Sequence, residues 1–434
     1  MAIYIPSTDD KSICNSIIGT DKIIIPSRYI LSHTAPDRFC RNSIMKIERN
    51  ILLFKLNGFF GNLWPLLALA VVYFQQITGS YATALCVFSA TTVSQSLSEV
   101  PTGVISDKIG RRYTLILYAV FSLFGLFLFS IAGNLGMPVL LFIGAFSRGI
   151  ADAFESGTGE ALLYETMQEL GKENEYDLVF SRSKMFGQIG LAVGASIAAT
   201  VTYFYSLNTL AWVSFGVVFF QLFIVLSFVE PKRSKKKKQI SSLKHFKNSW
   251  NALMQNKKLR YFAFIKMFQK ACGWTTYSFE SAYFNALIPV WAVSVVRIVK
   301  QTTGIISYAI APCFRKLGFL KTLMVSSFLM LLVDLTAIVL NTFVTPFIMS
   351  FVNLFHGVSE TAGSALFQKE FTQEQRATMG SIVSLIGALL LAAVYYVIGV
   401  VADIYSLYSA MLLLLFLKVL TVFGYYDLFK RYKD

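Results

Sequence analysis

Residues 99–112 read Glu99-Val-Pro-Thr-Gly103-Val-Ile-Ser-Asp107-Lys108-Ile-Gly110-Arg111-Arg112. It is a short charged turn between two long apolar runs, residues 82–105 before it and 113–132 after it. A carboxylate followed by three cations cannot remain in hydrocarbon, so the turn must lie at a membrane face and connect two spanning helices. Short loops rich in Lys and Arg stay on the cytoplasmic side, so we expect this face to be cytoplasmic.

The composition of the whole chain agrees with a polytopic membrane protein. Of its 434 residues, 55% are hydrophobic and only 15% are charged, and the mean hydropathy is +0.58. These values exclude a soluble domain. The net charge of +15 could indicate a nucleic-acid partner, but Lys and Arg gather in alternate connections, which is a topology signal. We therefore expect no nucleic-acid binding.

From residue 51 onward, long apolar runs alternate with short connections. A span of about 20 helical residues crosses a hydrocarbon core roughly 30 Å thick. The sequence predicts an all-α membrane protein with twelve transmembrane helices at 52–77, 82–105, 113–132, 138–164, 179–203, 209–229, 260–280, 286–310, 320–340, 346–368, 378–401 and 406–428.

The charge distribution tests this topology independently. No Lys or Arg occurs in the connections near 78–81, 132–138, 204–208, 281–286, 341–346 and 402–406. The opposite connections carry Lys108, Arg111, Arg112, Lys172, Arg182, Lys184, Arg315, Lys316, Lys321, Lys369 and Arg376. Both ends of the chain are also basic, so both termini are predicted to be cytoplasmic.

The connection at 230–259 divides the chain into two six-helix bundles, 51–229 and 260–428. It opens with a Lys-rich run and continues as an amphipathic piece at 243–254, which predicts a cytoplasmic linker with a helix on the lipid surface. A solvated charge run without a specific partner is the alternative. Residues 1–50 form a cytoplasmic N-terminal segment, either lying on anionic lipid or poorly ordered, and 429–434 form a cytoplasmic tail.

The charged turn at residues 99–112 also resembles a motif of a known protein family. Gly103, Asp107, Lys108, Gly110, Arg111 and Arg112 fit the loop G-x-x-x-D-R/K-x-G-R/K-R/K, by which this chain resembles the major facilitator superfamily of secondary transporters. The resemblance implies a cytoplasmic gate in which Asp107 latches onto the start of the eleventh span, near residues 377–380. It also implies that the basic residues reach Glu165. The alternative is a loop that sets topology and has no gating role.

The residues of this loop have physical roles beside the resemblance. Gly103 would let its helix pack closely on a neighbour, and Gly110 would permit the tight reversal. Asp107 could face the positive N-terminus of another helix. In the span 179–203, Gly187, Gly190 and Gly194 predict a small-residue face for close packing.

Ionisable residues inside three predicted spans are the candidate site. Such residues are costly in hydrocarbon, so they should face a cavity or a partner. Arg148, Asp152 and Glu155 share one helical face, Lys266, Lys270 and Trp274 share another, and His356 and Glu360 share a third. Arg148 and the residues after it also resemble the R-G-x-x-x-A-F-x-S-G pattern of bacterial major facilitators. In that family the first, fourth, seventh and tenth spans line a central cavity.

We expect these residues to form a polar site in which a carboxylate can take a proton. Burial favours the protonated carboxyl group and a neighbouring cation favours the ionised one, so substrate binding can be linked to proton movement. The alternative is that Arg148–Asp152 and Lys266–Glu360 are structural pairs that neutralise each other.

The sequence gives no signal for catalysis or for a cofactor. Five cysteines lack a C-x-x-C pair, and three histidines are scattered, so neither metal nor disulfide framework is predicted. No nucleophile–base pair or phosphate-binding loop is evident, so we do not expect an enzyme.

The resemblance implies a monomeric secondary active transporter in a bacterial inner membrane. It would move a small organic solute by alternating access, coupled to protons because several carboxylates line the path. The mixed charges favour an anionic or zwitterionic solute over a simple sugar. A lipid flippase and a non-transporting receptor or scaffold on the same fold are the alternatives.

Overall fold

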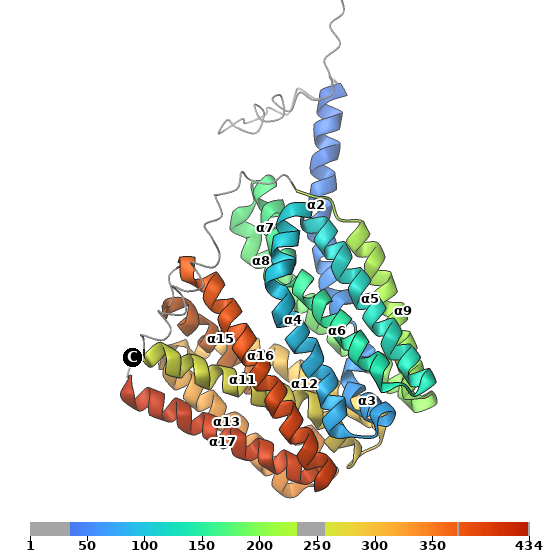
Figure 1. The fold of residues 1–434 in the computed structure, drawn as a ribbon. Helices are drawn as coiled ribbons and strands as arrows, with labels where there is room; N and C mark the ends of the chain where they lie inside the picture. Colours follow the sequence, from blue (N-terminus) through green and yellow to red (C-terminus); the bar gives the residue numbers. More distant parts are fainter. Residues whose placement is uncertain (1–34, 232–256, 371–372, 433–434) are drawn as a thin grey trace, which may run out of the picture.

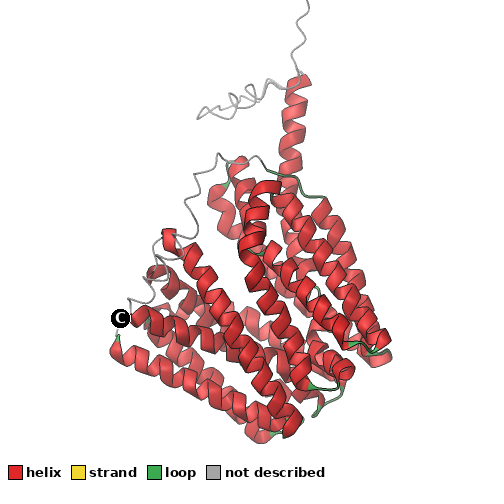
Figure 2. Ribbon diagram, viewed as in Figure 1, coloured by secondary structure: helices red, strands yellow, loops and turns green. Residues whose placement is uncertain are grey.

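The computed structural model describes residues 35–231, 257–370 and 373–432, and within these ranges the chain is helical without strands (Figure 2). The first half contains α2 (Ala35–Asn62), η1 (Pro65–Leu69), α3 (Ala70–Thr78), α4 (Tyr81–Ile109), α5 (Arg111–Leu135), α6 (Pro138–Glu155), α7 (Thr158–Glu169), η2 (Glu173–Glu175), α8 (Tyr176–Phe204) and α9 (Leu207–Leu226). The second half contains α11 (Lys257–Asn285), α12 (Val290–Ile310), η3 (Ala311–Leu317), α13 (Phe319–Leu340), α14 (Thr345–Ser350), α15 (Asn353–Glu370), α16 (Gln373–Ile404) and α17 (Leu407–Arg431).

These elements confirm the predicted all-α membrane fold. Nine transmembrane segments are single helices, and three are compound: α2 with η1 and α3, α6 with α7, and α14 with α15. By length and composition alone, 7 helices of the described residues could cross a membrane. Four helices that carry interior charges, α6, α11, α12 and α15, fall outside that group. The amphipathic piece expected at 243–254 lies outside the described residues.

The three compound segments differ from the continuous spans that the sequence predicts. Pro65 lacks an amide hydrogen, and η1 begins at this residue after α2 has ended at Asn62. Gly157 adopts φ 74°, a left-handed conformation that ends α6 and starts α7. At the third break, the amides of Phe351 and Val352 bond to carbonyl groups three residues back, which separates α14 from α15.

The helices end at two opposite faces of the molecule. The Gly110 end is the face that carries the turn between α4 and α5, and the Asp403 end is the opposite face, where α4 begins and α16 ends. In Figure 1 the two groups of helices lie together at the Asp403 end, at the bottom of the view, and diverge toward the Gly110 end.

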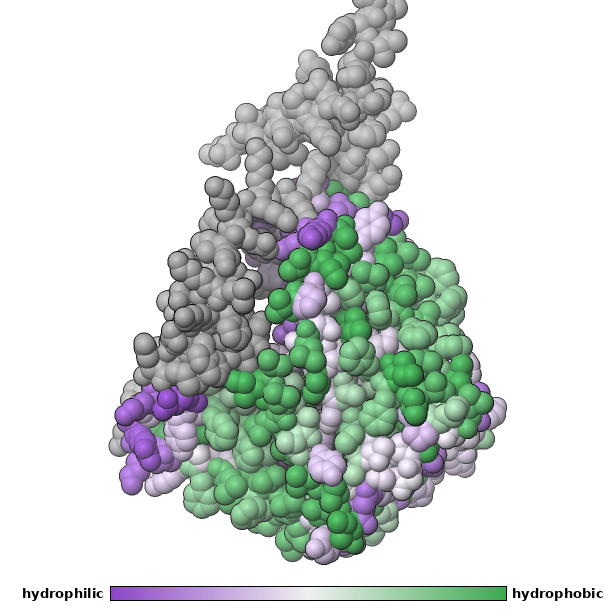
Figure 3. Space-filling view, in the orientation of Figure 1, coloured by the Kyte–Doolittle hydropathy of each residue, from purple (hydrophilic) through white to green (hydrophobic). Residues whose placement is uncertain are grey.

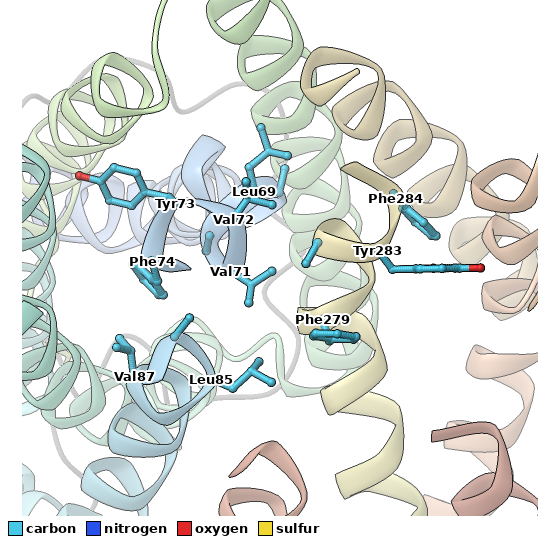
Figure 4. Close-up of a cluster of buried hydrophobic side chains, with 14 of the residues drawn as sticks. Leu69, Val71, Val72, Tyr73, Phe74, Leu85, Val87, Phe279, Tyr283 and Phe284 are labelled. Carbon is cyan, nitrogen blue, oxygen red and sulfur yellow. The ribbon is translucent and has the colours of Figure 1, made fainter. Parts of the chain in front are cut away.

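Buried apolar residues explain this arrangement. One large cluster takes side chains from both halves toward the Asp403 end, and Figure 4 shows Phe74, Leu85 and Phe279 of this cluster on α3, α4 and α11. Toward the Gly110 end the buried clusters are separate: one belongs to the first half and two belong to the second. The halves therefore share a core at one end only.

One set of direct contacts between the halves lies at the Asp403 end. The Asp403 carboxylate accepts hydrogen bonds from Ser80 Oγ at 2.6 Å, Tyr81 N at 2.7 Å and Ala82 N at 2.9 Å. It therefore caps the N-terminus of α4 from the other half, where a negative charge is favourable. Gly399 of α16 permits this approach, because a Cβ there would lie 2.4 Å from Ala82 Cα.

The outer surface is that of a membrane protein. Large apolar side chains such as Val139, Phe220 and Phe223 are more than half exposed, far beyond the scattered apolar exposure of soluble proteins. Figure 3 shows apolar residues across most of the visible helical face, with hydrophilic residues gathered near its edges. Such a surface is stable only in contact with lipid.

The small-residue face predicted for the span 179–203 is confirmed. A Cβ at Gly190 of α8 would lie 2.3 Å from Phe59 O of α2, and a Cβ at Gly187 would lie 2.9 Å from the Asn62 amide nitrogen. Only glycine allows two helical backbones to come this close. This contact places α2, and the Trp64 that follows it, against α8.

Candidate functional site

The charged turn at the Gly110 end is held by a carboxylate from the end of the first half. Glu230 accepts hydrogen bonds from the backbone amides of Arg111 at 2.8 Å and Arg112 at 2.7 Å, and so caps α5. Gly110 adopts φ 111°, and a Cβ there would lie 2.8 Å from Glu230 Oε1. Glycine is therefore required at this position for both conformation and space.

The basic residues of the turn bind three other helices. Arg111 Nε lies 3.3 Å from Glu165 Oε1 on α7, and Arg111 Nη2 lies 3.5 Å from Asp107 Oδ1. Arg112 Nη2 donates to Leu226 O of α9 at 2.9 Å. Lys108 is exposed. The side chains of residues 377–380, where the latch of Asp107 is expected, lie outside the described ones.

One expected role within this turn is wrong. Gly103 was expected to let α4 pack closely on a neighbour, but a Cβ at Gly103 would meet no described atom within 4 Å. Close packing of α4 depends instead on Gly149 of α6, where a Cβ would lie 2.3 Å from Thr91 O. The face of α4 that packs on α6 is therefore the one that carries Thr91, which lies nearer the middle of the helix.

Arg148 is the centre of the polar cluster in the first half. Its Nη2 lies 3.0 Å from Asp152 Oδ1 one turn along α6, and its Nη1 donates to Ser122 Oγ at 3.0 Å. The guanidinium carbon lies 5.1 Å from the ring centroid of Trp64 and 6.0 Å from that of Tyr118, within the range of cation–π attraction. The fixed guanidinium thus faces the break between α2 and η1.

Glu155 is not part of the Arg148–Asp152 ion pair. It is the last residue of α6 and is exposed, and it interacts electrostatically with Lys184 of α8 as well as with Asp152. The predicted common face of Arg148, Asp152 and Glu155 therefore contains one close ion pair, with a second carboxylate beside it toward the Gly110 end.

The predicted residues of the second half lie on α11 and α15. Lys266 interacts electrostatically with Glu360 and Lys270, and its Nζ would lie 2.9 Å from a Cβ at Gly363. His356 and Glu360 are exposed on α15 and interact with each other. These contacts join α11 to α15 within the second half.

Lys270 faces the first half. It is exposed and interacts electrostatically with Glu99 of α4, whose Oε1 accepts a hydrogen bond from Ser384 Oγ of α16 at 3.1 Å. Trp274, one turn beyond Lys270, is half exposed, and its ring centroid lies 5.8 Å from that of Tyr277. An exposed ammonium group and an exposed indole therefore lie along the side of α11 that faces the other half.

A second charged cluster lies in the second half, and its central acid, Glu280, was not among the predicted site residues. Glu280 of α11 is completely buried, and its Oε1 lies 2.6 Å from Arg297 Nη1 while its Oε2 lies 2.5 Å from Lys300 Nζ. Close by, Asp334 and Lys418 form an ion pair at 2.6 Å. The rule that ionisable residues inside spans need partners could have identified Glu280, but this residue stands at the last position of the predicted span 260–280.

Comparisons with known proteins agree with this architecture. The family model described as Major Facilitator Superfamily matches residues 53–314. No sequence among the curated proteins matches the chain significantly.

Three solved structures have folds similar to that of this chain. The nucleoside transporter NupG has a TM-score of 0.73 at 16% identity, covering 90% of this chain and 99% of that one. A D-xylose-proton symporter has a TM-score of 0.68 at 13% identity, covering 87% and 96%. A bacterial homologue of the human lysosomal transporter Spinster, inward-facing and unoccupied, has a TM-score of 0.68 at 12% identity, covering 89% and 97%.

Residues 53–314, which the family model matches, include both stretches that resemble the major facilitator superfamily. Residues 99–112 form the turn at the Gly110 end, and Arg148 lies in the polar cluster of α6, so the sequence match and the three-dimensional likeness refer to the same helices. The chain is therefore an integral membrane protein that crosses the bilayer several times, and it belongs to the major facilitator superfamily of transporters.

Proposed function

We propose that this protein is a secondary active transporter that moves a small organic solute by alternating access, coupled to protons. The observation that carries the proposal is the asymmetric joining of its halves. They share an apolar core and the Asp403 cap at one end, and they have separate cores toward the other. Ionised side chains such as Arg148 and Lys270 lie between these ends, where two halves that rock could expose them to either side.

The orientation follows from the charges at the two ends. Arg111, Arg112 and Lys172 belong to the Gly110 end, whereas the connections of the Asp403 end contain no Lys or Arg. The positive-inside rule makes the Gly110 end cytoplasmic, so both termini are cytoplasmic and the conformation described is inward-facing. The resemblance of the stretch after Arg148 to bacterial major facilitators supports placement in a bacterial inner membrane, where the chain would act as a monomer.

The turn at the Gly110 end would serve as the gate of the opposite state. Asp107, held beside Arg111, is placed at the end of α4, and the N-terminus of α16 would attract its negative charge when the cytoplasmic ends close. Asp403 makes the corresponding contact with the N-terminus of α4 at the other end. Asp403 would thus stabilise the state in which the Asp403 end is closed, and Asp107 would stabilise the state in which the Gly110 end is closed.

Proton coupling would involve the ion pairs of the two halves. Asp152 is neutralised by Arg148, and Glu360 interacts with Lys266. A carboxylate in hydrocarbon surroundings must either keep its cation or take a proton. A solute that binds the cation would leave the carboxylate without its partner, and the carboxylate would then take a proton. Solute movement and proton movement would be coupled in this way.

The test is solute-driven proton movement in proteoliposomes. Purified protein is reconstituted with a pH-sensitive dye in the lumen, and pools of amino acids, organic acids, nucleosides and sugars are added outside. We expect one pool to change the luminal pH, a protonophore to abolish the change, and Asp152→Asn to reduce it. Asp427→Asn, which alters an acid at the end of α17, is the matched control. Solute flux that ignores an imposed pH gradient would contradict coupling.

A further inference from the structure

A groove of the second half lies at the Gly110 end, between the start of α11 and the end of α17. These two helices pack on each other, and Figure 1 shows their ends side by side at the left edge of the molecule. The groove has a volume of about 430 Å³, and small-molecule sites have volumes of roughly 300–1,000 Å³. It is lined by Lys257, Arg260, Tyr261, Phe264, Arg431 and Tyr432.

The groove faces lipid and not the other half. Lys257, Tyr261 and Phe264 recur at intervals of four and three residues and so share one face of α11, which Phe268 continues. Two residues turn an α-helix by about 200°, so this face lies opposite Lys270, which faces the first half. Phe264 is 55% exposed on this outer face. The groove is therefore separate from the polar cluster that includes Lys270.

The chemistry of the groove changes with depth in the membrane. Lys257 stands at the Gly110 end of α11, and Phe264 lies about 10 Å farther along the helix. The ring of Phe264 stacks on that of Phe268, with 6.3 Å between the centroids, and extends the apolar wall inward. Basic groups at the membrane surface and aromatic rings below them match a phospholipid, which has a polar head group and acyl chains.

The charge around the groove favours an anionic head group. The segments 257–264 and 424–432 form it; their basic residues are Lys257, Lys258, Arg260, Lys430 and Arg431, and their one acid is Asp427. The Asp427 carboxylate lies 2.8 Å from Arg431 Nε and also accepts a hydrogen bond from the Tyr261 hydroxyl. This acid therefore holds α17 against α11 and leaves the groove with an excess of basic residues. Basic pockets between helices at the cytoplasmic surface bind anionic lipid head groups.

We propose that this groove binds an anionic phospholipid of the leaflet at the Gly110 end. Its phosphate would lie among Lys257, Arg260 and Arg431, and an acyl chain would lie along Phe264. The planar guanidinium groups suit phosphate because each can donate two parallel hydrogen bonds to it. Since the groove lies outside the polar cluster, the lipid would bind whether or not the protein carries a solute.

Native mass spectrometry of the purified chain in a neutral detergent tests the lipid preference. Phosphatidylglycerol and phosphatidylcholine with identical acyl chains are titrated, and glycerol 3-phosphate is added as a soluble competitor. We expect phosphatidylglycerol to bind more tightly than phosphatidylcholine and to resist displacement by glycerol 3-phosphate. Equal binding of the two lipids would overturn the proposal. Displacement by an equal concentration of glycerol 3-phosphate would also overturn it, because the groove would then take a soluble phosphate ester.

Single substitutions locate the site. Lys257→Gln and Arg260→Gln should each weaken phosphatidylglycerol binding about fivefold, which is the contribution of one basic residue near an anionic lipid surface. Phe264→Ala should weaken both lipids, because it removes apolar surface from the acyl chain. Arg182→Gln is the matched control, since it removes an exposed arginine from α8 at the same end of the molecule, and it should bind as the unaltered protein does.

The control separates a defined site from general attraction. If Arg182→Gln weakens phosphatidylglycerol as much as Arg260→Gln does, the lipid responds to the overall basic charge of the Gly110 end and the proposed site is wrong. Unchanged affinity in both Lys257→Gln and Arg260→Gln would also refute the site.

Discussion

Replacing Asp403 with asparagine should open the Asp403 end of the molecule. In the structure this carboxylate accepts hydrogen bonds from Ser80 Oγ, Tyr81 N and Ala82 N at 2.6–2.9 Å. Asparagine keeps an acceptor oxygen but removes the negative charge that faces the N-terminus of α4. Because these contacts exist only while the two halves touch at this end, their loss destabilises the state in which the Asp403 end is closed and leaves the opposite state unchanged.

The size of the effect can be worked out from these contacts. Hydrogen bonds to an ionised acceptor are about twice as strong as neutral ones, and a charge at a helix N-terminus contributes about 0.3–1 kcal/mol. Asp403 is exposed, so solvent screens part of this. A total of about 1–2 kcal/mol remains, which changes the ratio of the two states by a factor of about 5–30.

Pulsed EPR distances across the Asp403 end would measure this ratio. Spin labels are attached at Tyr205→Cys in the first half and Tyr405→Cys in the second, two exposed positions at this end, after the native cysteines have been replaced. Asp403→Asn should add a population at longer distance, while Asp427→Asn at the Gly110 end should not. Identical distance distributions for the unaltered protein and Asp403→Asn would refute the reasoning.

Three further substitutions test other contacts. Gly399→Val should raise the long-distance population in the same EPR assay, because its Cβ would collide with Ala82; an unchanged distribution would show that α4 and α16 do not close here. Glu230→Gln should lower the free energy of unfolding by about 1 kcal/mol by weakening the cap of α5, measured by denaturant unfolding, and equal stability would contradict the cap. Asp107→Asn should lower transport in proteoliposomes without abolishing solute binding, and equal transport by both proteins would argue against a latch.

Most of the fold could be predicted from the sequence because it depends on local patterns. The turn around Gly110 has charged residues between apolar runs, and 7 helices of the described residues have the length and composition of a membrane helix. The glycines of α8 were also sufficient to predict close packing on a neighbouring helix. These features depend on residue type and spacing within one segment, which the sequence displays directly.

The remaining features depend on contacts between distant segments. Glu230 caps α5 across 119 positions of chain from Arg111, and the helix breaks at Pro65 and Gly157 interrupt stretches that were predicted to be continuous spans. Glu280 stood at the last position of a predicted span, and no local pattern pairs it with Arg297 and Lys300 of α12. Pairing of side chains from different helices is set by packing, and hydropathy does not encode it.

The most direct measurement of the central claim is the water accessibility of Lys270. If ionisable residues line a wet passage open to the Gly110 end, Lys270→Cys in oriented vesicles, with the native cysteines replaced because Cys313 is exposed, should react with a membrane-impermeant maleimide added at that end and stay unreactive toward the reagent added at the other. Phe220→Cys, on the exposed apolar face of α9, should stay unreactive from both sides. Lys270→Cys as unreactive as Phe220→Cys would contradict a water-filled passage between the two halves.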